Sequence, residues 1–168
     1  MQINDVAGLL DYLTSTHTRT RRIIECVPRE MLEWAPADGK FSFGDLVRHL
    51  AGIERFMYAE NVHGRPSRYP GHDRSLAEGY DATLAYYDRL HAESRELFAA
   101  LDRDALERKC ATPAGTPITT WKWLRAMFEH EAHHRGQIYL MLGLRGVKTP
   151  PIYGLTSEEV RERSALAQ

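Results

Sequence analysis

The sequence predicts an all-α protein, a four-helix bundle followed by a short C-terminal helix. Three observations lead to this prediction. Apolar residues recur at the spacing of one helix face along four long segments. Glycine and proline residues interrupt the chain between these segments. No stretch alternates apolar and polar residues over more than three or four positions, so long strands are not expected.

Capping and helix-breaking residues bound the first two helices. The first helix begins after Asn4 or Asp5, whose side chains can accept hydrogen bonds from free backbone N–H groups, and it ends before Pro28. Ser42 is followed three residues later by Asp45, which is close to a capping box and predicts the start of the second helix.

The later helices show the same apolar spacing. The third is expected to reach Leu101 and the fourth to run from about residue 121 to residue 144. Gly136 interrupts the fourth helix and predicts a close crossing with a neighbour, because glycine otherwise lowers helix stability by up to about 1 kcal/mol. Thr156 and Glu159 form a capping box at the start of the short last helix.

The connections between the helices are long. Residues 28–41, 63–80 and 102–118 are all long enough to cross a bundle, so their length does not determine the order of the helices. Residues 102–118 contain two prolines and a glycine and are expected to be irregular.

Size and composition predict one globular domain over residues 1–168, because a chain of this length can bury a substantial core. The formal net charge of -1 argues against nucleic-acid binding, which depends on neutralising phosphates. No apolar run approaches the roughly 20 residues needed to span a membrane. Two cysteines are too few for a disulfide scaffold, and we expect a cytoplasmic protein.

Histidines define the candidate functional site. His130 and His134 lie four residues apart in the fourth helix, so their side chains stand one above the other on its inward face. Two imidazoles placed in this way can bind one divalent ion, whereas His133 points to another face. His49 flanks the apolar stripe of the second helix and is the best third ligand. The alternative is a structural role, in which each histidine is hydrogen-bonded without a metal.

Two residues near the histidines can orient the imidazoles. Glu131 and Gln137 are candidates, because metal-bound histidines usually donate their second N–H group to an oxygen of the protein. For Glu131 the alternative is an ion pair with a neighbouring arginine.

The same residues also fit two other kinds of metal site. Residues 130–134 have the H-E-x-x-H pattern of metallohydrolases, in which the glutamate is the general base. However, no strand is predicted that could align a substrate, and no histidine follows His134 as a third ligand. A di-metal carboxylate bundle needs two Glu-x-x-His pairs. Glu131 with His134 and Glu60 with His63 have this spacing, but His63 lies at the end of its helix.

The chain resembles the DinB-like (YfiT-related) family of metal-binding bacterial proteins. The residues that carry the resemblance are 42–50 at the start of the second helix and 130–138 in the fourth. Trp34, Pro36 and residues 143–150 also lie where this family has similar features. The resemblance spans nearly the whole chain, and its most specific part is the histidine segment of the fourth helix.

This resemblance implies a four-helix bundle with an up-down-down-up order. It also implies one divalent metal ion, zinc or nickel, bound by His49, His130 and His134. Relatives in the family include transferases and isomerases that use low-molecular-weight thiols such as bacillithiol or mycothiol, and dimers are common among them. We therefore expect a homodimer whose partners are a small thiol and an electrophilic substrate.

Three neutral imidazoles leave the charge of a divalent ion uncompensated and at least one coordination position open, which is the arrangement of catalytic sites. A thiol bound there is deprotonated and becomes a nucleophile. The sequence therefore favours a metal-dependent S-transferase. The alternative is a non-catalytic stress or binding protein whose metal only stabilises the helices.

Overall fold

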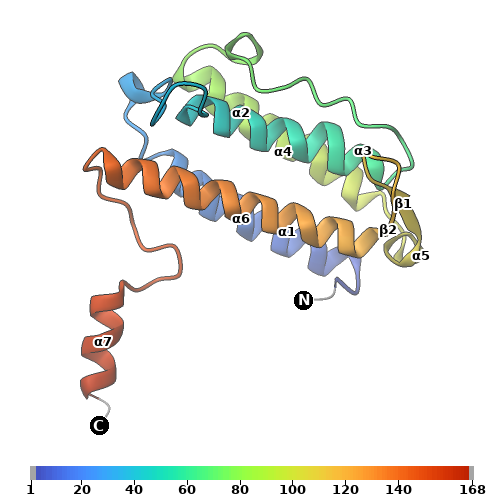
Figure 1. Cartoon of the computed structure of the whole chain (residues 1–168). Coiled ribbons are helices and arrows are strands. Elements are labelled where there is room, and N and C mark those ends of the chain that lie inside the picture. Colours follow the sequence, from blue (N-terminus) through green and yellow to red (C-terminus); the bar gives the residue numbers. More distant parts are fainter. Residues whose placement is uncertain (1–2, 167–168) are drawn as a thin grey trace.

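The predicted four-helix bundle is confirmed in a computed structural model, which describes residues 3–166 (Figure 1). Within these residues the long helices are α1 (Val6–Ile24), α2 (Phe43–Ile53), α4 (Tyr80–Ala99) and α6 (Thr120–Leu144). A π-helical segment, η2 (Glu54–Tyr58), joins α2 to the short α3 (Ala59–Asn61). The remaining helical elements are η1 (Arg29–Met31), η3 (Arg74–Leu76), α5 (Arg103–Glu107) and α7 (Ser157–Leu166).

The helices follow the up-down-down-up order. Helices α2 and α4 pack against each other and run in the same direction, because residues 62–79 carry the chain back along the length of the bundle (Figure 1). Helices α1 and α6 form the other pair, and both run in the direction opposite to that of α2 and α4. The contacts of α1 with α4 and of α6 with α2 close the bundle. The N-terminal half of α2 therefore faces the C-terminal half of α6.

Three predicted helix caps are present. The Asp5 side chain accepts a hydrogen bond from the backbone of Gly8 at 2.6 Å. Ser42 and Asp45 form a reciprocal capping box at the start of α2, with bonds of 2.9 and 3.0 Å. Thr156 and Glu159 do the same before α7. These caps satisfy backbone N–H groups that have no partner inside their helix, and so they determine where each helix begins.

Residues 102–118, which were expected to be irregular, contain regular structure. The short helix α5 is followed by a hairpin of two three-residue strands, β1 (Lys109–Ala111) and β2 (Pro117–Thr119), which pair antiparallel. Strands this short show too little alternation to be recognised from periodicity. The hairpin leads directly into α6, where the backbone N–H of Thr120 donates to the carbonyl of Arg108 at 2.9 Å. Thr119, the residue before α6, makes no side-chain cap.

Two clusters of charged side chains, each centred on a fully buried residue, hold the long connection 62–79 against the bundle. The first surrounds Glu60, which has no exposed surface and pairs with Arg55, Arg65 and Arg68 at 2.6–2.8 Å. Two of these arginines belong to the connection. Because the Glu60 carboxylate is fully buried, loss of these arginines would leave its charge without compensation and would be strongly destabilising.

The second cluster surrounds Arg48, whose side chain is fully buried in α2. Its guanidinium pairs with Glu33 and Asp45 and donates to the backbone carbonyls of His72 and Ala77. One side chain thus ties the segment before α2 to the far end of the connection 62–79. As a result, this connection is fixed where it passes over α2.

The apolar core consists of two clusters along the bundle. One contains the C-terminal half of α1, most of α2 and the end of α6, and the other contains the opposite ends of these helices. Helix α7 contributes no buried residue and extends away from the bundle (Figure 1). The close helix crossing predicted at Gly136 is not present, since a Cβ atom added there meets nothing within 4 Å. None of the helices in residues 3–166 is long and apolar enough to cross a membrane.

Candidate metal centre

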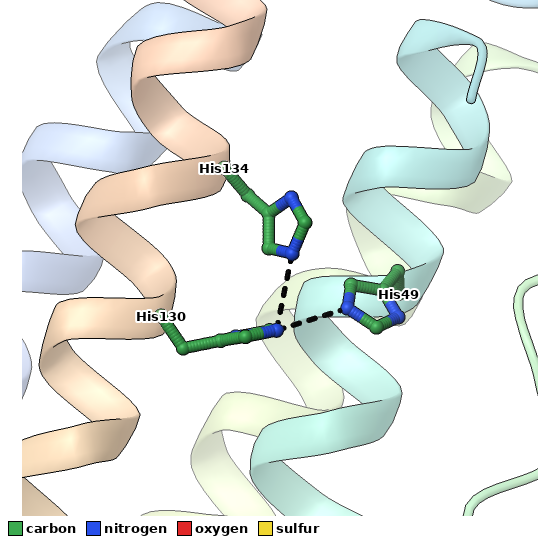
Figure 2. Close-up of side chains that lie close together, drawn as sticks. All are labelled: His49, His130 and His134. Atoms are coloured by element: carbon green, nitrogen blue, oxygen red, sulfur yellow. Dashed lines mark hydrogen bonds between the residues drawn. The ribbon is translucent and has the colours of Figure 1, made fainter. Parts of the chain in front are cut away.

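Helices α2 and α6 bring the three predicted histidines together. His130 and His134 lie one turn apart on α6, and His49 faces them from α2 (Figure 2). The Nε2 atom of His130 is 3.0 Å from Nε2 of His49 and 3.1 Å from Nε2 of His134. All three ligand atoms lie within 4.8 Å of one another. The sequence prediction that residues from two separate helices converge at one point therefore agrees with the structure.

The donor set fits a divalent cation. Zinc binds imidazole nitrogen at about 2.0–2.1 Å, so two nitrogen atoms 3.0–3.1 Å apart can share one ion, and Nε2 of His130 lies at this distance from both His49 and His134. Among the residues that the structure describes, no further histidine, cysteine or carboxylate joins the cluster. Three neutral nitrogen ligands leave coordination positions open, as in catalytic rather than structural zinc sites. Imidazole ligands suit nickel as well as zinc.

The surroundings keep the imidazoles in the neutral form that metal binding requires. Burial, together with the neighbouring His130 and His134, lowers the pKa of His49 to about 3. Burial and the neighbouring histidines lower the pKa of His130 to about 4. Burial also lowers the pKa of His134. Protons therefore compete with a metal ion less effectively here than at a free imidazole, whose ordinary pKa is 6.5.

Oxygen atoms orient two of the rings from outside. The Nδ1 atom of His134 lies 2.6 Å from Oε1 of Gln137, which is one turn further along α6. Because an amide oxygen only accepts, Nδ1 carries the proton and the Nε2 lone pair is directed toward the other histidines. The Nδ1 atom of His49 lies 2.7 Å from the hydroxyl of Tyr69. Such outer partners hold metal-binding imidazoles in their tautomer and orientation.

Tyr69 was not predicted from the sequence. It belongs to the connection 62–79, which the two charge clusters hold over α2, and its hydroxyl also lies 3.4 Å from Nδ1 of His72. A tyrosine in a polar loop carries no periodic signal. Only the path of the connection along the bundle brings it to His49, and helix order is what the sequence pattern alone left open.

A cleft of about 400 Å³ opens beside the histidines, between residues 36–41 and the last turns of α6. His134 and Gln137 line one end, and Phe41 lies close to both His49 and His134, with ring centroids 5.5 and 6.3 Å away. The volume is within the range of sites that bind small molecules. A metal ion at the triad would therefore border a space large enough for a substrate.

Comparison with known families agrees with this architecture. Residues 12–138, most of the chain, match the DinB superfamily. The chain belongs to the DinB superfamily. No curated protein matches this DinB protein in sequence.

Several solved structures share the fold. A DinB-like protein from Bacillus cereus superimposes with a TM-score of 0.73 at 17% identity, covering 88% of this chain and 97% of that one. YfiT from Bacillus subtilis, described as a probable metal-dependent hydrolase with an unusual four-helix bundle topology, gives 0.67 at 18% identity and covers 85% and 89%. A mycothiol-dependent maleylpyruvate isomerase gives 0.65 at 14% identity, over 79% of this chain and 60% of the isomerase. At these identities the likeness shows the fold alone.

Glu131 does not reach the DinB histidine triad. Its side chain is buried on another face of α6, where Oε1 accepts a hydrogen bond from the Tyr87 hydroxyl at 3.2 Å. Burial, and then the nearby Glu54, raise the pKa of Glu131 to about 7. Within residues 3–166 this carboxylate orients none of the three imidazoles, and it forms no ion pair with an arginine. Instead, Arg135 donates to the Thr20 hydroxyl at 3.1 Å.

The two alternative metal sites find no support in the geometry. The glutamate of the H-E-x-x-H pattern is Glu131, which is bound to Tyr87 and does not border the triad. The di-metal alternative needs Glu60 and His63, but three arginines occupy the Glu60 carboxylate. The Nε2 atom of His63 bonds to the backbone carbonyl of Leu97 at 2.9 Å. Both residues lie at the end of the bundle near α3, away from the triad.

Proposed function

We propose that this DinB protein is a metal-dependent S-transferase, in which His49, His130 and His134 hold one divalent ion and a low-molecular-weight thiol attacks an electrophilic substrate. The observation that supports this proposal most directly is the convergence of three neutral imidazoles beside a cleft, with no fourth protein ligand among the described residues. Such a site is built to accept an external ligand.

A bound divalent ion supplies Lewis acidity, which lowers the pKa of a thiol placed next to it so that the sulfur is a thiolate at neutral pH. The thiol proton passes to solvent, the sulfur forms a bond with an electrophilic carbon, and the leaving group departs with its electron pair. The chain itself positions the reaction. Gln137 and Tyr69 keep their imidazoles oriented, and Phe41 lines the cleft next to His49 and His134.

The structural likeness to a mycothiol-dependent isomerase supports thiol chemistry within this fold. Because the identity is only 14%, the choice of thiol is part of our proposal. Bacillithiol and mycothiol are the thiols to be tested, with zinc and nickel as metals. A cytoplasmic homodimer remains a prediction from the sequence.

A hydrolase is the second candidate, since the structurally similar YfiT is described as a probable metal-dependent hydrolase. Hydrolysis in an H-E-x-x-H site relies on the glutamate as general base. Here Glu131 is buried and bonded to Tyr87, so this base is absent from the triad. A thiol needs less help from a base, because its pKa is far lower than that of water. The geometry therefore favours transfer over hydrolysis.

The test uses purified protein loaded with zinc or nickel, each thiol in turn, and the chromogenic electrophile 1-chloro-2,4-dinitrobenzene. We expect the metal-loaded protein to form the thioether faster than metal-free protein, and His133→Ala to retain this rate because His133 is exposed and outside the triad. No acceleration with any thiol and either metal would refute the proposal.

Chelation separates catalysis from a purely structural metal. If the metal only stabilises the bundle, its removal lowers the melting temperature strongly, since binding free energy then acts as folding free energy. If the site is catalytic, we expect thiol transfer to stop while far-ultraviolet circular dichroism still reports a helical protein. Neither apolar core cluster contains a histidine of the triad, so we expect the protein to stay folded without the metal.

A further inference from the structure

We propose that the cleft beside His134 binds the electrophilic substrate, and that this substrate is an apolar small molecule carrying a carboxylate. This inference rests on the proposed function, because it assigns the electrophile its place next to the triad. The cleft contains both apolar walls and groups that attract an anion.

The walls of the cleft are apolar. Phe41 and Leu46 line it from one side, and Met141 lines it from α6. Leu140 and Leu144, one turn apart on α6, also line it, and each leaves 64% of its surface exposed. A single exposed leucine is common in proteins, but two that border one cleft form an apolar surface that a ligand can cover. Covering apolar surface contributes roughly 25 cal/mol per Å².

The end of the cleft nearest the triad presents hydrogen-bond donors. The Oε1 atom of Gln137 is occupied by the N–H group of His134, at 2.6 Å. The side-chain NH₂ group of the same amide is left for other partners, and Gln137 lines the cleft. An amide NH₂ group donates two hydrogen bonds and accepts none. A ligand at this end therefore matches the site best when it presents acceptor oxygens.

Lys40 adds a positive charge to the cleft. It is exposed, and within residues 3–166 it forms no ion pair. None of the described residues that line the cleft is acidic. A free ammonium group beside amide donors and apolar walls is complementary to a carboxylate on an apolar body. Charge complementarity of this kind selects among ligands and speeds their approach.

Binding of unreactive ligands tests the cleft without relying on catalysis. The probes are 4-methyl-3-nitrobenzoate and its uncharged methyl ester, titrated into the zinc-loaded full-length protein by calorimetry. We expect the carboxylate to bind about 10-fold or more tightly than the ester, as for a hydrogen bond to a charged group. In Lys40→Met we expect the preference for the carboxylate to fall by several-fold, while the affinity for the ester stays unchanged. In Leu144→Asn we expect both ligands to bind more weakly.

Lys122→Met is the matched control, because Lys122 lies at the start of α6, against the ring of Trp121 and far from the cleft along the helix. It should keep the preference for the carboxylate. Failure of both probes to bind, equal binding of the two probes by the unaltered protein, or an undiminished preference for the carboxylate in Lys40→Met would overturn the inference.

The reactive pair 4-chloro-3-nitrobenzoate and 1-chloro-2,4-dinitrobenzene separates this inference from the proposed function. Carboxylate-selective binding without thiol transfer to either compound would refute the transferase but support the cleft. Transfer to both compounds with no preference for the carboxylate, and with no effect of Lys40→Met, would support the transferase but refute the cleft as assigned here.

Discussion

The amide oxygen of Gln137 accepts a hydrogen bond from Nδ1 of His134 at 2.6 Å, although only one turn of helix separates the two residues. This bond selects the tautomer in which the Nε2 lone pair of His134 is directed toward His49 and His130. One polar side chain on α6 thus makes its neighbour ready to bind a cation.

Replacing Gln137 by leucine should weaken metal binding by about 10–100-fold, because the proton on Nδ1 of His134 loses its acceptor. Gln137→Glu keeps an acceptor oxygen and should retain the affinity. Competition with a chromophoric zinc chelator measures both variants. Equal affinities for the leucine variant and the unaltered protein would show that the bond has no part in metal binding.

His130→Ala should reduce the bound metal from about one ion per chain to nearly none, since Nε2 of His130 is the atom closest to both other ligands. His133→Ala is the matched control on the same helix and should retain the metal. Elemental analysis of the purified variants measures the metal content. Full occupancy in His130→Ala would place the metal elsewhere.

Glu131→Gln tests both the buried carboxylate and the hydrolase alternative. The folded pKa of Glu131 is about 7 and its ordinary value is 4.5, so the folded state holds the proton more tightly. The contribution of Glu131 to stability is therefore fully present below pH 4.5 and is lost as the pH rises toward 7. Glutamine does not titrate. The free energy of unfolding of the variant, relative to that of the unaltered protein, should therefore rise by on the order of 3 kcal/mol between pH 4.5 and 8.

Urea unfolding of both metal-loaded proteins across this pH range measures the difference, in which the contributions of the shared histidines cancel. A constant difference would show that folding does not raise the pKa of Glu131. We also expect Glu131→Gln to retain thiol transfer, because the carboxylate does not border the triad. Complete loss of activity with normal metal content would restore Glu131 as a catalytic candidate.

Two glycines should respond in opposite ways to alanine. A Cβ atom on Gly44 lies 2.9 Å from both Nη2 of Arg48 and Oε1 of Glu33, so Gly44→Ala should destabilise the protein by about 1–3 kcal/mol. A Cβ atom on Gly136 meets nothing within 4 Å, and Gly136→Ala should stabilise α6 by up to about 1 kcal/mol. Thermal unfolding compares the two; the same sign for both would contradict this account of their packing.

Helical periodicity and capping residues were sufficient to predict the four long helices, and the four-residue spacing of His130 and His134 was sufficient to place them together. These signals are local, because they depend on residues within a few turns of one another. His49 was assigned from its position beside an apolar stripe and from the family resemblance. Its meeting with α6 depends on the packing of distant segments.

Features that depend on the path of the chain could not be read in this way. Tyr69 reaches His49 only because Arg48 and Glu60 hold the connection 62–79 in place. Helix periodicity places Glu131 on the buried side of α6, but it does not tell whether the side chain contacts the histidines or another helix. The strands β1 and β2 are stabilised by pairing with each other, and their sequences are too short to reveal it.

The parallel arrangement of α2 and α4 has an evolutionary consequence. Two antiparallel helices joined by a tight turn have no spare segment that could pass over their side. Here residues 62–79 must travel the length of the bundle, and they cross above His49 on the way. We expect mutations in the connection 62–79 to alter the surroundings of His49 while leaving the packing of the four helices unchanged. The substrate selectivity and the stability of the protein can then evolve separately.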